Sequence, residues 1–437
     1  MDIAGVSIDS RSIREGELFV AIKGDRYDGH DFVPDALKKG ACGALVERSA
    51  LEKKFSVLGG LKNILPVEDT LFALQEMALM HRKKFSIPVV GITGSNGKTT
   101  TKEMLANIMK QKGPVLKNEG NLNNHIGVPL TLMKLNEGHR AAVVEMGMSA
   151  AGEIDVLARL IAPTIGVITN IGPAHLEFFG SLSKIADAKG ELLDNLNGDA
   201  TAVLNADDPF CEALRKKFSG PTVTFGIEKP ADVQAARIIQ GADHIDFTIT
   251  ARNATVDVRL RTVGSHNIYN ALAAAAAALA MGMPLDAVKY GLNDFTPVAM
   301  RSELRDIDGR TVLADCYNAN PASVEAAIKT AVSLAAGRKT IVVLGDMLEL
   351  GTASAEAHRE IGRIVAQSGV ELVITLGELA IYIGEGARKA GMLVSRTIEA
   401  RTHAGAAQLV MKLSRPGDVI LIKGSRGMKM EKILEAF

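Results

Sequence analysis

Short apolar runs that alternate with longer helix-like segments constrain the fold of this chain more than any other feature. Between residues 87 and 297 these runs are VVGIT, AAVVEMG, IGVITNIG and TAVLN, and the segments between them have helical patterning. Short apolar runs between helices are typical of parallel strands that are buried on both faces. The sequence therefore predicts an α/β fold in which helices cover both sides of a mostly parallel sheet.

Changes in pattern divide the chain into three predicted domains. Residues 1–84 form a small α/β N-terminal domain, which begins with short alternating segments and ends in a helical stretch. Residues 85–297 form a central mononucleotide-binding domain, and the segment 232–263 within it has the pattern of a small antiparallel meander. Residues 298–437 contain the runs KTIVVLGD, ELVITLG and DVILIKG, each followed by a helical pattern, which predicts a Rossmann-like C-terminal domain.

Charge and cysteine content exclude several classes of protein. Lys+Arg and Asp+Glu both number 50, so net charge favours neither nucleic acid nor a membrane surface as a partner. Cys42, Cys211 and Cys316 have no metal-binding or redox spacing, which fits a reducing cytoplasm. No signal-peptide pattern opens the chain, and the apolar stretch 271–283 is short and rich in alanine, so we expect a packed helix and no membrane insertion.

The stretch VVGITGSNGKTTTKEM (89–104) combines an apolar strand, a glycine turn and the start of a helix. Glycine lets the backbone approach phosphate oxygens, and a helix N-terminus offers free N–H groups and the positive end of its dipole. Lys98 is expected to contact the terminal phosphates, and the Thr99 hydroxyl to ligate Mg²⁺. The predicted ATP-binding residues of this loop are Gly94, Ser95, Asn96, Gly97, Lys98, Thr99 and Thr100.

The spacing of this loop is unusual. The common phosphate loop has Gly five residues before the Gly-Lys pair, but Ile92 occupies that position here. The shorter loop TGSNGKTT resembles that of the Mur ligases of peptidoglycan synthesis and of the folylpolyglutamate synthetases, which are ATP-dependent amide-forming enzymes. The chain lacks the Asn-Lys dipeptide of GTPases, and its next core strand ends in Glu145 rather than the Asp of switches and kinases.

Further stretches resemble one branch of the Mur ligases, the UDP-N-acetylmuramoyl-tripeptide–D-alanyl-D-alanine ligases. The sister branch that adds the third peptide residue usually carries Asp-Asn-Pro-Arg, which is absent here. The branch usually has about a strand and a helix more before DSR, so we expect the N-terminal domain to be shortened at its start. The matching stretches are collinear and cover nearly the whole chain: DSRSIREGELFVAIKGDRYDGHDF, GNLNNHIGVPLTL, VVEMGMSAAGEI, TNIGPAHLEFFGSL, AKGELL, GSHNIYNALAAAAAAL, MRSELR, ADCYNANPAS, LGDMLELG and KGSRGMKMEK.

The resemblance implies an ADP-forming ligase with a two-step reaction. The tripeptide carboxylate attacks the γ-phosphate of ATP to give an acyl phosphate, and the amine of D-Ala-D-Ala then displaces phosphate. Both reactants of the first step are anions, and two unit charges about 4 Å apart repel by about 4 kcal/mol at an effective dielectric of about 20. The implied cofactors are therefore ATP and two Mg²⁺ ions, in a monomeric cytoplasmic enzyme with small-molecule substrates.

The resemblance also implies the metal ligands. Thr99 and Glu145 would hold the first Mg²⁺, and His175 and Lys189 would help to hold the second, with Lys189 carbamylated so that it presents a carboxylate rather than an ammonium. The predicted catalytic residues are Lys98, Glu145, His175 and Lys189. The alternatives are a solvated carboxylate for Glu145, a satisfied polar side chain for His175 and a surface lysine for Lys189.

Other residues are assigned to ATP by the same resemblance. Asn267 and Asn270 lie three apart on a predicted helix, and an amide that donates and accepts matches the N6/N7 edge of adenine. Arg301 would contact the γ-phosphate and Asp315 the ribose hydroxyls, which requires the domains to close. Helix capping by one of the two asparagines, and surface roles for Arg301 and Asp315, are the alternatives.

The remaining assignments concern the two substrates. The UDP end is expected in the first domain, the bound substrate is held near the phosphate loop, and the dipeptide carboxylate meets an arginine fork after the strand VILIKG. Ser10, Arg11 and Lys23 are the predicted contacts of the UDP end. Asn123 and Asn124 are predicted to hold the bound substrate, and Ser425 and Arg426 to meet the dipeptide carboxylate.

Two other functions are weighed against this one. They are another Mur or folylpolyglutamate-type ligase, which the stretch DSR…DGHDF disfavours, and a P-loop ATPase switch, which the Glu145, His175 and Lys189 group disfavours. The sequence leaves open whether the third peptide residue is lysine or diaminopimelate, and which base deprotonates the amine.

Overall fold

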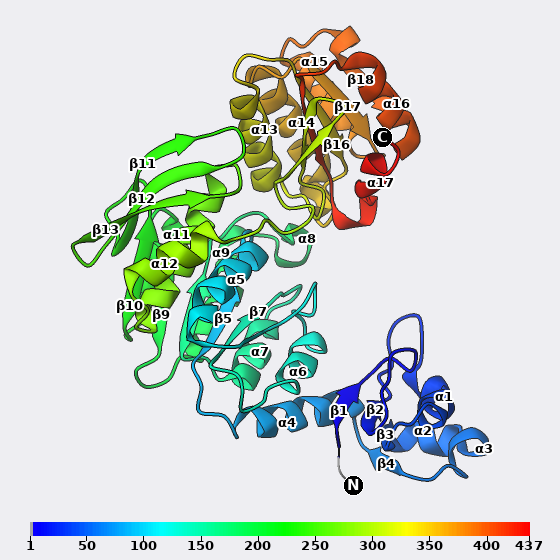
Figure 1. Cartoon of the computed structure of the whole chain (residues 1–437). Helices are drawn as coiled ribbons and strands as arrows, with labels where there is room; N and C mark the ends of the chain where they lie inside the picture. Colours follow the sequence, from blue (N-terminus) through cyan, green and yellow to red (C-terminus); the bar gives the residue numbers. More distant parts are fainter. Residues whose placement is uncertain (1–2) are drawn as a thin grey trace.

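Three sheets organise the chain, which a computed structural model describes from residue 3 to residue 437. They follow one another along the sequence and lie in separate parts of the molecule, coloured blue, cyan to green, and yellow to red (Figure 1). The first is a parallel sheet of β1 (Gly5–Ser7), β2 (Glu17–Val20), β3 (Gly43–Glu47) and β4 (Ile64–Val67). Its helices are α1 (Val33–Lys38), α2 (Arg48–Lys53) and α3 (Phe55–Leu58).

The second sheet has nine strands in the order β13-β12-β11-β10-β9-β8-β5-β7-β6. Its strands from β10 to β6 are parallel, as the alternating pattern predicts. They are β5 (Val89–Thr93), β6 (Val115–Lys117), β7 (Ala141–Glu145), β8 (Ile165–Ile168), β9 (Thr201–Asn205) and β10 (Thr222–Gly226).

The predicted antiparallel meander is present and continues this same sheet. It consists of β11 (Val233–Gln240), β12 (Ile245–Ala251) and β13 (Ala254–Leu260), and β11 pairs with β10 in parallel. The meander is therefore an extension of the central sheet, and no gap in hydrogen bonding separates the two.

Helices cover both faces of the central sheet, which confirms the prediction of strands buried on both sides. One face packs against α5 (Lys98–Met109), α11 (His266–Ala280) and α12 (Leu285–Asn293). The other packs against α6 (Gly127–Leu132), α7 (Glu153–Ile161), α9 (Leu182–Asp194) and α10 (Pro209–Lys217). Residues 271–279 of the alanine-rich stretch lie in α11 and are buried against α5 and the sheet, and no helix in residues 3–437 has the length and apolar character to cross a bilayer.

The third sheet has the order β14-β15-β19-β16-β17-β18. It is parallel except for the β14–β15 hairpin at its edge, so the predicted Rossmann-like domain is confirmed with one added antiparallel strand. The strands are β14 (Glu303–Ile307), β15 (Arg310–Ala314), β16 (Thr340–Gly345), β17 (Leu372–Leu376), β18 (Thr397–Ala400) and β19 (Val419–Lys423). The helices are α13 (Pro321–Ala335), α14 (Ser354–Gln367) and α15 (Ile381–Lys389) on one face, and α16 (His403–Leu413) and α17 (Glu431–Leu434) on the other.

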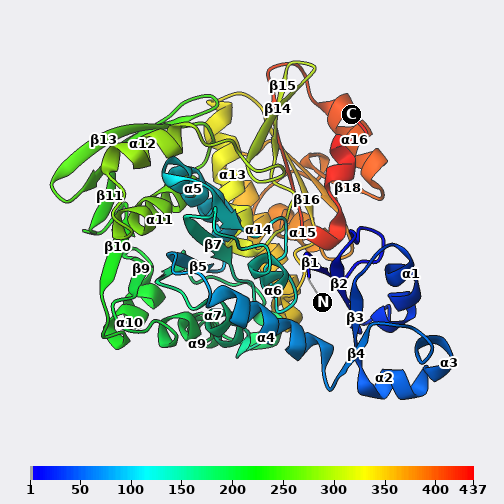
Figure 2. The same cartoon turned by 60° about the horizontal axis from the view of Figure 1, so that its bottom comes forward.

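Helix α4 (Thr70–Arg82) joins the first two parts. Its Leu74 packs with the N-terminal strands, whereas its Ala78 belongs to the core of the central sheet. Arg82 Nε donates to the carbonyl of Ile161 at 2.9 Å, which fixes the end of the helix to the central domain. Figures 1 and 2 both show α4 running from the central helices toward the N-terminal sheet.

Candidate active site

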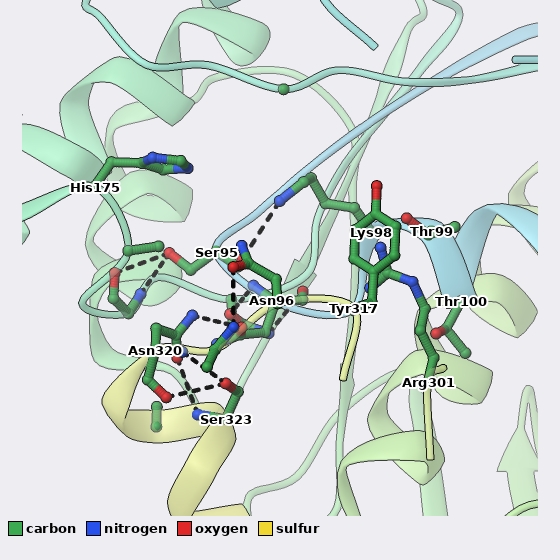
Figure 3. Close-up of a pocket in the computed structure, with 18 of the residues that line it drawn as sticks. Ser95, Asn96, Lys98, Thr99, Thr100, His175, Arg301, Tyr317, Asn320 and Ser323 are labelled. Atoms are coloured by element: carbon green, nitrogen blue, oxygen red, sulfur yellow. Dashed lines mark hydrogen bonds between the residues drawn. The ribbon is translucent and has the colours of Figure 1, made fainter. Parts of the chain in front are cut away.

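A cavity of about 800 Å³ lies between the central and C-terminal domains. Its central wall is formed by the loops that follow β5, β7 and β8, and its other wall by the loops that follow β15, β16 and β19. All six loops leave the carboxyl ends of parallel strands, which is where open α/β sheets bind ligands. Figure 3 shows the two walls facing each other across the phosphate loop.

Two glycines of the phosphate loop are fixed by close contacts. Gly94 has φ +146°, and a Cβ there would lie 1.9 Å from Thr169 Oγ1; Gly97 has φ +82°, and its Cβ would lie 2.0 Å from Asn270 Oδ1. Thr169 Oγ1 also donates to the carbonyl of Asn96 at 2.6 Å. A side chain at either position would displace the loop. Glycine avoids this and leaves the backbone there free to face a ligand.

Lys98 curls back over this loop. Its Nζ donates to the carbonyls of Gly94 at 2.7 Å and Ser95 at 3.3 Å. Burial lowers the pKa of Lys98; nearby Glu145 opposes that shift and Arg301 adds to it. The cavity therefore holds a desolvated amine from the central wall and a guanidinium from the C-terminal wall, which suits an anionic ligand.

Glu145 lies at the end of β7 with only 3% of its surface exposed. The Thr99 hydroxyl donates to its Oε2 at 2.8 Å, and Asn123 Nδ2 donates to its Oε1 at 2.8 Å. Glu145 is therefore a buried, oriented carboxylate beside the phosphate loop, which excludes the alternative of a solvated group.

The donors around Glu145 fit Mg²⁺, although the protein offers few of them. Thr99 and Glu145 present hard oxygen atoms, and Mg²⁺ commonly takes one or two protein ligands with phosphate and water. Within residues 3–437 no three His, Cys, Asp or Glu side chains gather into a metal site. A metal here would therefore depend on oxygens from the nucleotide.

Lys189 is buried in α9, with 2% of its surface exposed, and lines the cavity. Burial, with repulsion from Lys98 added, lowers its pKa well below the usual value. This excludes the alternative of an ordinary surface lysine. The shift favours the neutral, nucleophilic form of the amine over the ammonium.

His175 contacts the C-terminal domain. Its Nδ1 lies 2.6 Å from Glu349 Oε2, although the two atoms are not aligned for a hydrogen bond. The backbone of both residues is left-handed, with φ +59° and +63°, and the amide of Glu177 donates to the carbonyl of Glu349 at 3.2 Å. The contact with His175 lowers the pKa of Glu349, against the opposing effect of burial. His175 is thus an interdomain contact as well as a cavity residue.

Asn267 and Asn270 line the cavity but bond within α11 and its approach. Asn267 Nδ2 donates to the carbonyl of Val263 at 2.8 Å, and Asn270 Nδ2 donates to Asn267 Oδ1 at 3.0 Å. Asn267 thus bonds to the backbone that precedes its helix, while Asn270 Oδ1 faces Gly97. The predicted pair is therefore brought together beside the phosphate loop.

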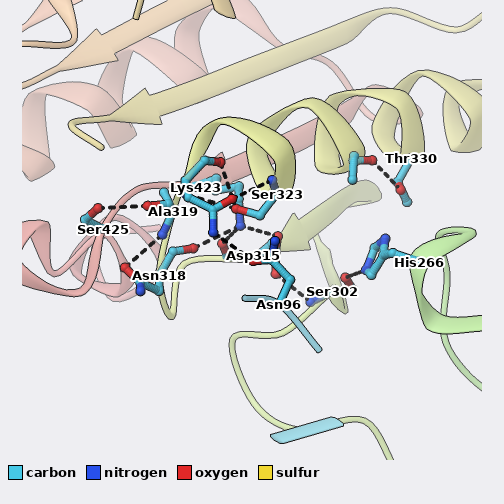
Figure 4. A network of polar contacts seen from close by, with 12 residues as sticks. Asn96, His266, Ser302, Asp315, Asn318, Ala319, Ser323, Thr330, Lys423 and Ser425 are labelled. Atoms are coloured by element: carbon cyan, nitrogen blue, oxygen red, sulfur yellow. Dashed lines mark hydrogen bonds and ion pairs between the residues drawn. The ribbon is translucent and has the colours of Figure 1, made fainter. Parts of the chain in front are cut away.

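The C-terminal wall presents charged groups from just before β14, just after β15 and the end of β19. The Arg301 guanidinium lies 3.9 Å from the ring centre of Tyr317, and its Nε is buried without a partner in the described chain. Lys423 Nζ donates to Asp315 Oδ2 at 2.6 Å, and the amide of Ser302 donates to Asp315 Oδ1 at 3.1 Å. Burial is the largest single influence and raises the pKa of Asp315, but Lys423, His266 and the Ser302 amide together outweigh it and the net shift is downward. Figure 4 shows this network.

The two predicted dipeptide contacts also line this wall. The Ser425 hydroxyl donates to the carbonyl of Ala319 at 3.2 Å and accepts from the amide of Leu348 at 2.9 Å. Arg426 pairs with Glu431 at 2.9 Å. Ser425 therefore joins three loops of the wall, and Arg426 is the more available of the two.

One hydrogen bond joins the walls directly at the phosphate loop. Asn320 Nδ2 donates to Asn96 Oδ1 at 2.8 Å, and Asn320 caps the N-terminus of α13 with Ser323 (Figure 3).

The predicted residues of the first domain lie away from this cavity. Ser10 is buried and its carbonyl accepts from Lys39 Nζ at 3.0 Å; Arg11 pairs with Asp9 at 2.7 Å; Lys23 is exposed. In contrast, Asn123 and Asn124 line the cavity. The structure thus brings together every predicted site residue except the three on the N-terminal domain.

Sequence reasoning missed several cavity and support residues. Most lie inside stretches that had already been singled out, such as GSHNIYN, ADCYNANPAS, LGDMLELG and KGSRGMKMEK, so their neighbours were the available signal. They are Lys102, Asn118, His266, Tyr317, Asn320, Glu349 and Lys423.

Comparison with known families gives matches along almost the whole chain. Residues 2–82 match the model "Mur ligase family, catalytic domain", residues 92–278 the "Mur ligase middle domain" and residues 300–426 the "Mur ligase, glutamate ligase domain".

Curated relatives agree with these models. The chain is 39% identical over 435 residues to UDP-N-acetylmuramoyl-tripeptide–D-alanyl-D-alanine ligase of Bacillus subtilis (strain 168), covering 99% of this chain and 93% of the relative. The enzyme of the same name from Escherichia coli (strain K12) is 35% identical with the same coverage.

Solved structures show the same arrangement. MurF from Acinetobacter baumannii superposes with a TM-score of 0.89 at 32% identity, over 99% of this chain and 93% of that one. MurF from Thermotoga maritima in complex with ADP gives 0.87 at 30% identity, over 99% and 96%. Folylpolyglutamate synthase from Mycobacterium tuberculosis, at 18% identity and a TM-score of 0.67, covers 82% of this chain and 92% of its own, and shares the fold alone.

Proposed function

The chain belongs to the Mur ligase family, and on that premise we propose that it joins D-alanyl-D-alanine to UDP-N-acetylmuramoyl-tripeptide in an ATP-dependent, ADP-forming reaction of peptidoglycan precursor synthesis. The observation that carries this proposal is the single cavity in which the phosphate loop, Glu145 and Lys189 of the central domain face Arg301 and Arg426 of the C-terminal domain. A switch that only binds nucleotide has no need of the second wall.

The domains divide the work in this proposal. Residues 1–84 bind the UDP end of the sugar substrate, through Ser10, Arg11 and Lys23. Residues 85–297 bind ATP, and residues 298–437 bind the dipeptide, with Arg426 at its carboxylate. Asn123 and Asn124, which line the cavity beside Glu145, hold the tripeptide end near the phosphate loop.

Nucleotide binding rests on the phosphate loop and on groups from both walls. Backbone N–H groups at the start of α5 and the Lys98 amine face the phosphates. Asn267 and Asn270 serve the adenine edge, Arg301 the γ-phosphate and Asp315 the ribose. The unpartnered Nε of Arg301 supports its role, because a buried guanidinium N–H requires an acceptor.

Chemistry begins when the tripeptide carboxylate attacks the γ-phosphorus and ADP leaves, which gives an acyl phosphate. The dipeptide amine then adds to the acyl carbon, loses its proton, and phosphate departs as the amide forms. Thr99 and Glu145 would hold Mg²⁺ together with the nucleotide, and the ion would supply positive charge against the repulsion of the two anions. Closure of the two walls on the substrates would exclude water, which would otherwise hydrolyse the acyl phosphate.

Lys189 is carbamylated in this proposal. Its neutral amine adds to the carbon of CO₂ and releases one proton, which leaves a carbamate anion in place of a potential cation. The lowered pKa supports this, since only the neutral amine is nucleophilic. The carbamate and His175 would then serve a second Mg²⁺. We also propose that the enzyme works as a monomer in the cytoplasm.

The test is product analysis with purified protein, ATP and Mg²⁺. Mass spectrometry should detect the UDP-N-acetylmuramoyl-pentapeptide when both the tripeptide substrate and D-Ala-D-Ala are present. Parallel reactions with lysine and diaminopimelate tripeptides identify the third residue. A product with a folate and glutamate, and none with the muramoyl tripeptide, would instead support the folylpolyglutamate-type alternative.

A further inference from the structure

A buried lysine that the proposed chemistry does not use lies one helical turn beyond the phosphate loop. Lys102 has 1% of its surface exposed and faces β6 and β7 from α5. An unpaired ammonium in such a place is costly, so its partners indicate its purpose. Its Nζ donates to the carbonyl of Asn118 at 2.6 Å and lies 3.2 Å from Glu103 Oε1 and 3.9 Å from Glu145 Oε2.

Asn118, the main partner of Lys102, is fully buried and holds the backbone of Glu145 from both sides. Its Oδ1 accepts from the amide of Glu145 at 2.9 Å, and its Nδ2 donates to the carbonyl of Glu145 at 2.9 Å. These two hydrogen bonds fix both peptide groups that flank the Glu145 side chain. The end of β7 therefore cannot rotate without breaking two buried hydrogen bonds.

Asn118 also controls the loop that supplies the next contact. Its Nδ2 donates to the carbonyl of Leu122 at 2.9 Å, directly before Asn123. Asn123 Nδ2 then donates to Glu145 Oε1, and the amide of Gly147 donates to the carbonyl of Asn123 at 2.8 Å. Asn123, on the loop that Asn118 holds, thus orients one carboxylate oxygen of Glu145. Thr99 on α5 orients the other oxygen.

We propose that Lys102 and Asn118 are positioning residues that orient the Glu145 carboxylate for the magnesium bound with the nucleotide. Lys102 anchors Asn118 and places a positive charge behind the carboxylate, and Asn118 fixes the backbone and the Asn123 loop. Neither residue lines the cavity, and both lie behind Glu145. The inference rests on the proposed function only in taking Glu145 as a ligand of that magnesium.

The experiment measures nucleotide binding rather than turnover. The affinity of the full-length protein for a nonhydrolysable ATP analogue is titrated against Mg²⁺ by calorimetry, in wild type and in Lys102→Met, which keeps the buried volume. We expect the Mg²⁺ concentration at the midpoint of this titration to rise about 10- to 100-fold in Lys102→Met, as when a hydrogen-bond partner of a metal ligand is lost. Affinity for the analogue without Mg²⁺ should stay at the wild-type value, because the phosphate loop is unchanged.

Thr101→Val is the matched control. Thr101 is the neighbouring residue on α5, is fully buried, and its hydroxyl has no partner within the described chain. Its replacement changes the same core without touching Glu145, so its Mg²⁺ midpoint should equal that of wild type. A second test variant, Asn118→Ser, removes the bonds to Glu145 while keeping a polar group, and should shift the midpoint as Lys102→Met does.

Each outcome decides the matter. Midpoints in both test variants equal to that of Thr101→Val would overturn the proposal. Failure of both variants to fold, judged by circular dichroism, would also overturn it, since the network would then serve stability alone. If wild type binds the analogue without any dependence on Mg²⁺, the magnesium role in the proposed function fails instead, and the two failures are distinguishable.

Discussion

Single residues in the cavity take their chemistry from burial. Lys98, Lys102 and Lys189 are lysines of one domain, and the surroundings give each a different task. Lys98 bends over the phosphate loop, whereas Lys102 pairs with Glu103 and donates to the Asn118 carbonyl. Lys189 has no acidic partner within the described chain, and burial lowers its pKa well below normal. The sequence alone does not distinguish the tasks of these three lysines.

Replacement of Lys189 tests its part in the reaction. We expect Lys189→Ala to lose nearly all ligase activity, and added bicarbonate not to restore it, because the carbamate needs the lysine amine. Lys184→Ala is the control, as Lys184 is exposed on the same helix. Initial rates of amide formation in the two variants provide the measurement. Near-normal turnover of Lys189→Ala would remove this residue from the site.

Local elements were easier to predict than single side-chain contacts. The phosphate loop and the strands KTIVVLGD, ELVITLG and DVILIKG follow from apolar runs and glycine. The β14–β15 hairpin was missed, although Asp308 and Gly309 form its turn with φ +51° and +74°, as Asp-Gly turns do. Its polar edge strand, ELRDI, lacks the apolar run that identified β16, β17 and β19, and β15 and β18 were not predicted either.

Gly97 tests the geometry of the phosphate loop. Gly97→Ala should weaken ATP binding, since alanine would have φ +82° and its Cβ would meet Asn270 Oδ1. Left-handed backbone alone costs about 1 kcal/mol or more, and the clash adds to it. Gly282→Ala is the control, because Gly282 has φ +74° in open space. Equal ATP affinity in the two variants would show that the close contact has no consequence.

The loop that carries Glu349 depends on a buried histidine. His358 Nε2 accepts from the amide of Met347 at 2.9 Å, and its Nδ1 donates to the carbonyl of Ser354 at 2.7 Å. Burial lowers the pKa of His358, and this exceeds the opposing effects of Ser354 and Asp346. The neutral ring is thus required in the folded state, since a protonated Nε2 cannot accept.

A depressed folded-state pKa means that the stability from His358 is complete above its usual value of 6.5 and is lost as pH falls below it. Thermal unfolding between about pH 7.5 and pH 5 should therefore show a declining Tm in wild type. His358→Gln should have a lower Tm at the upper end and a shallower decline. An identical pH slope in both proteins would refute this role.

At the scale of the whole molecule, one chain builds both walls of the cavity. Asn320 reaches Asn96 and Glu349 reaches His175, so residues more than 150 positions apart in sequence meet at the site. These contacts could not be predicted from the sequence, because they depend on how two domains face each other. The strands that carry them were predictable, since each wall consists of loops at the carboxyl ends of parallel strands.

Both walls of the cavity belong to one chain, and the proposed function takes the enzyme to be a monomer. We therefore expect light scattering of the purified protein to give a mass near 46.3 kDa at working concentrations, with or without ligands. A mass twice as large, together with activity that falls on dilution, would show instead that the site requires a second copy.

The central claim is that the two walls act together on three substrates. Phosphate release by the purified protein, measured with ATP and Mg²⁺, tests it most directly. The account predicts rapid release only when UDP-N-acetylmuramoyl-tripeptide and D-Ala-D-Ala are both present, and background release when either is left out. Steady ATP hydrolysis that is indifferent to both compounds would contradict it.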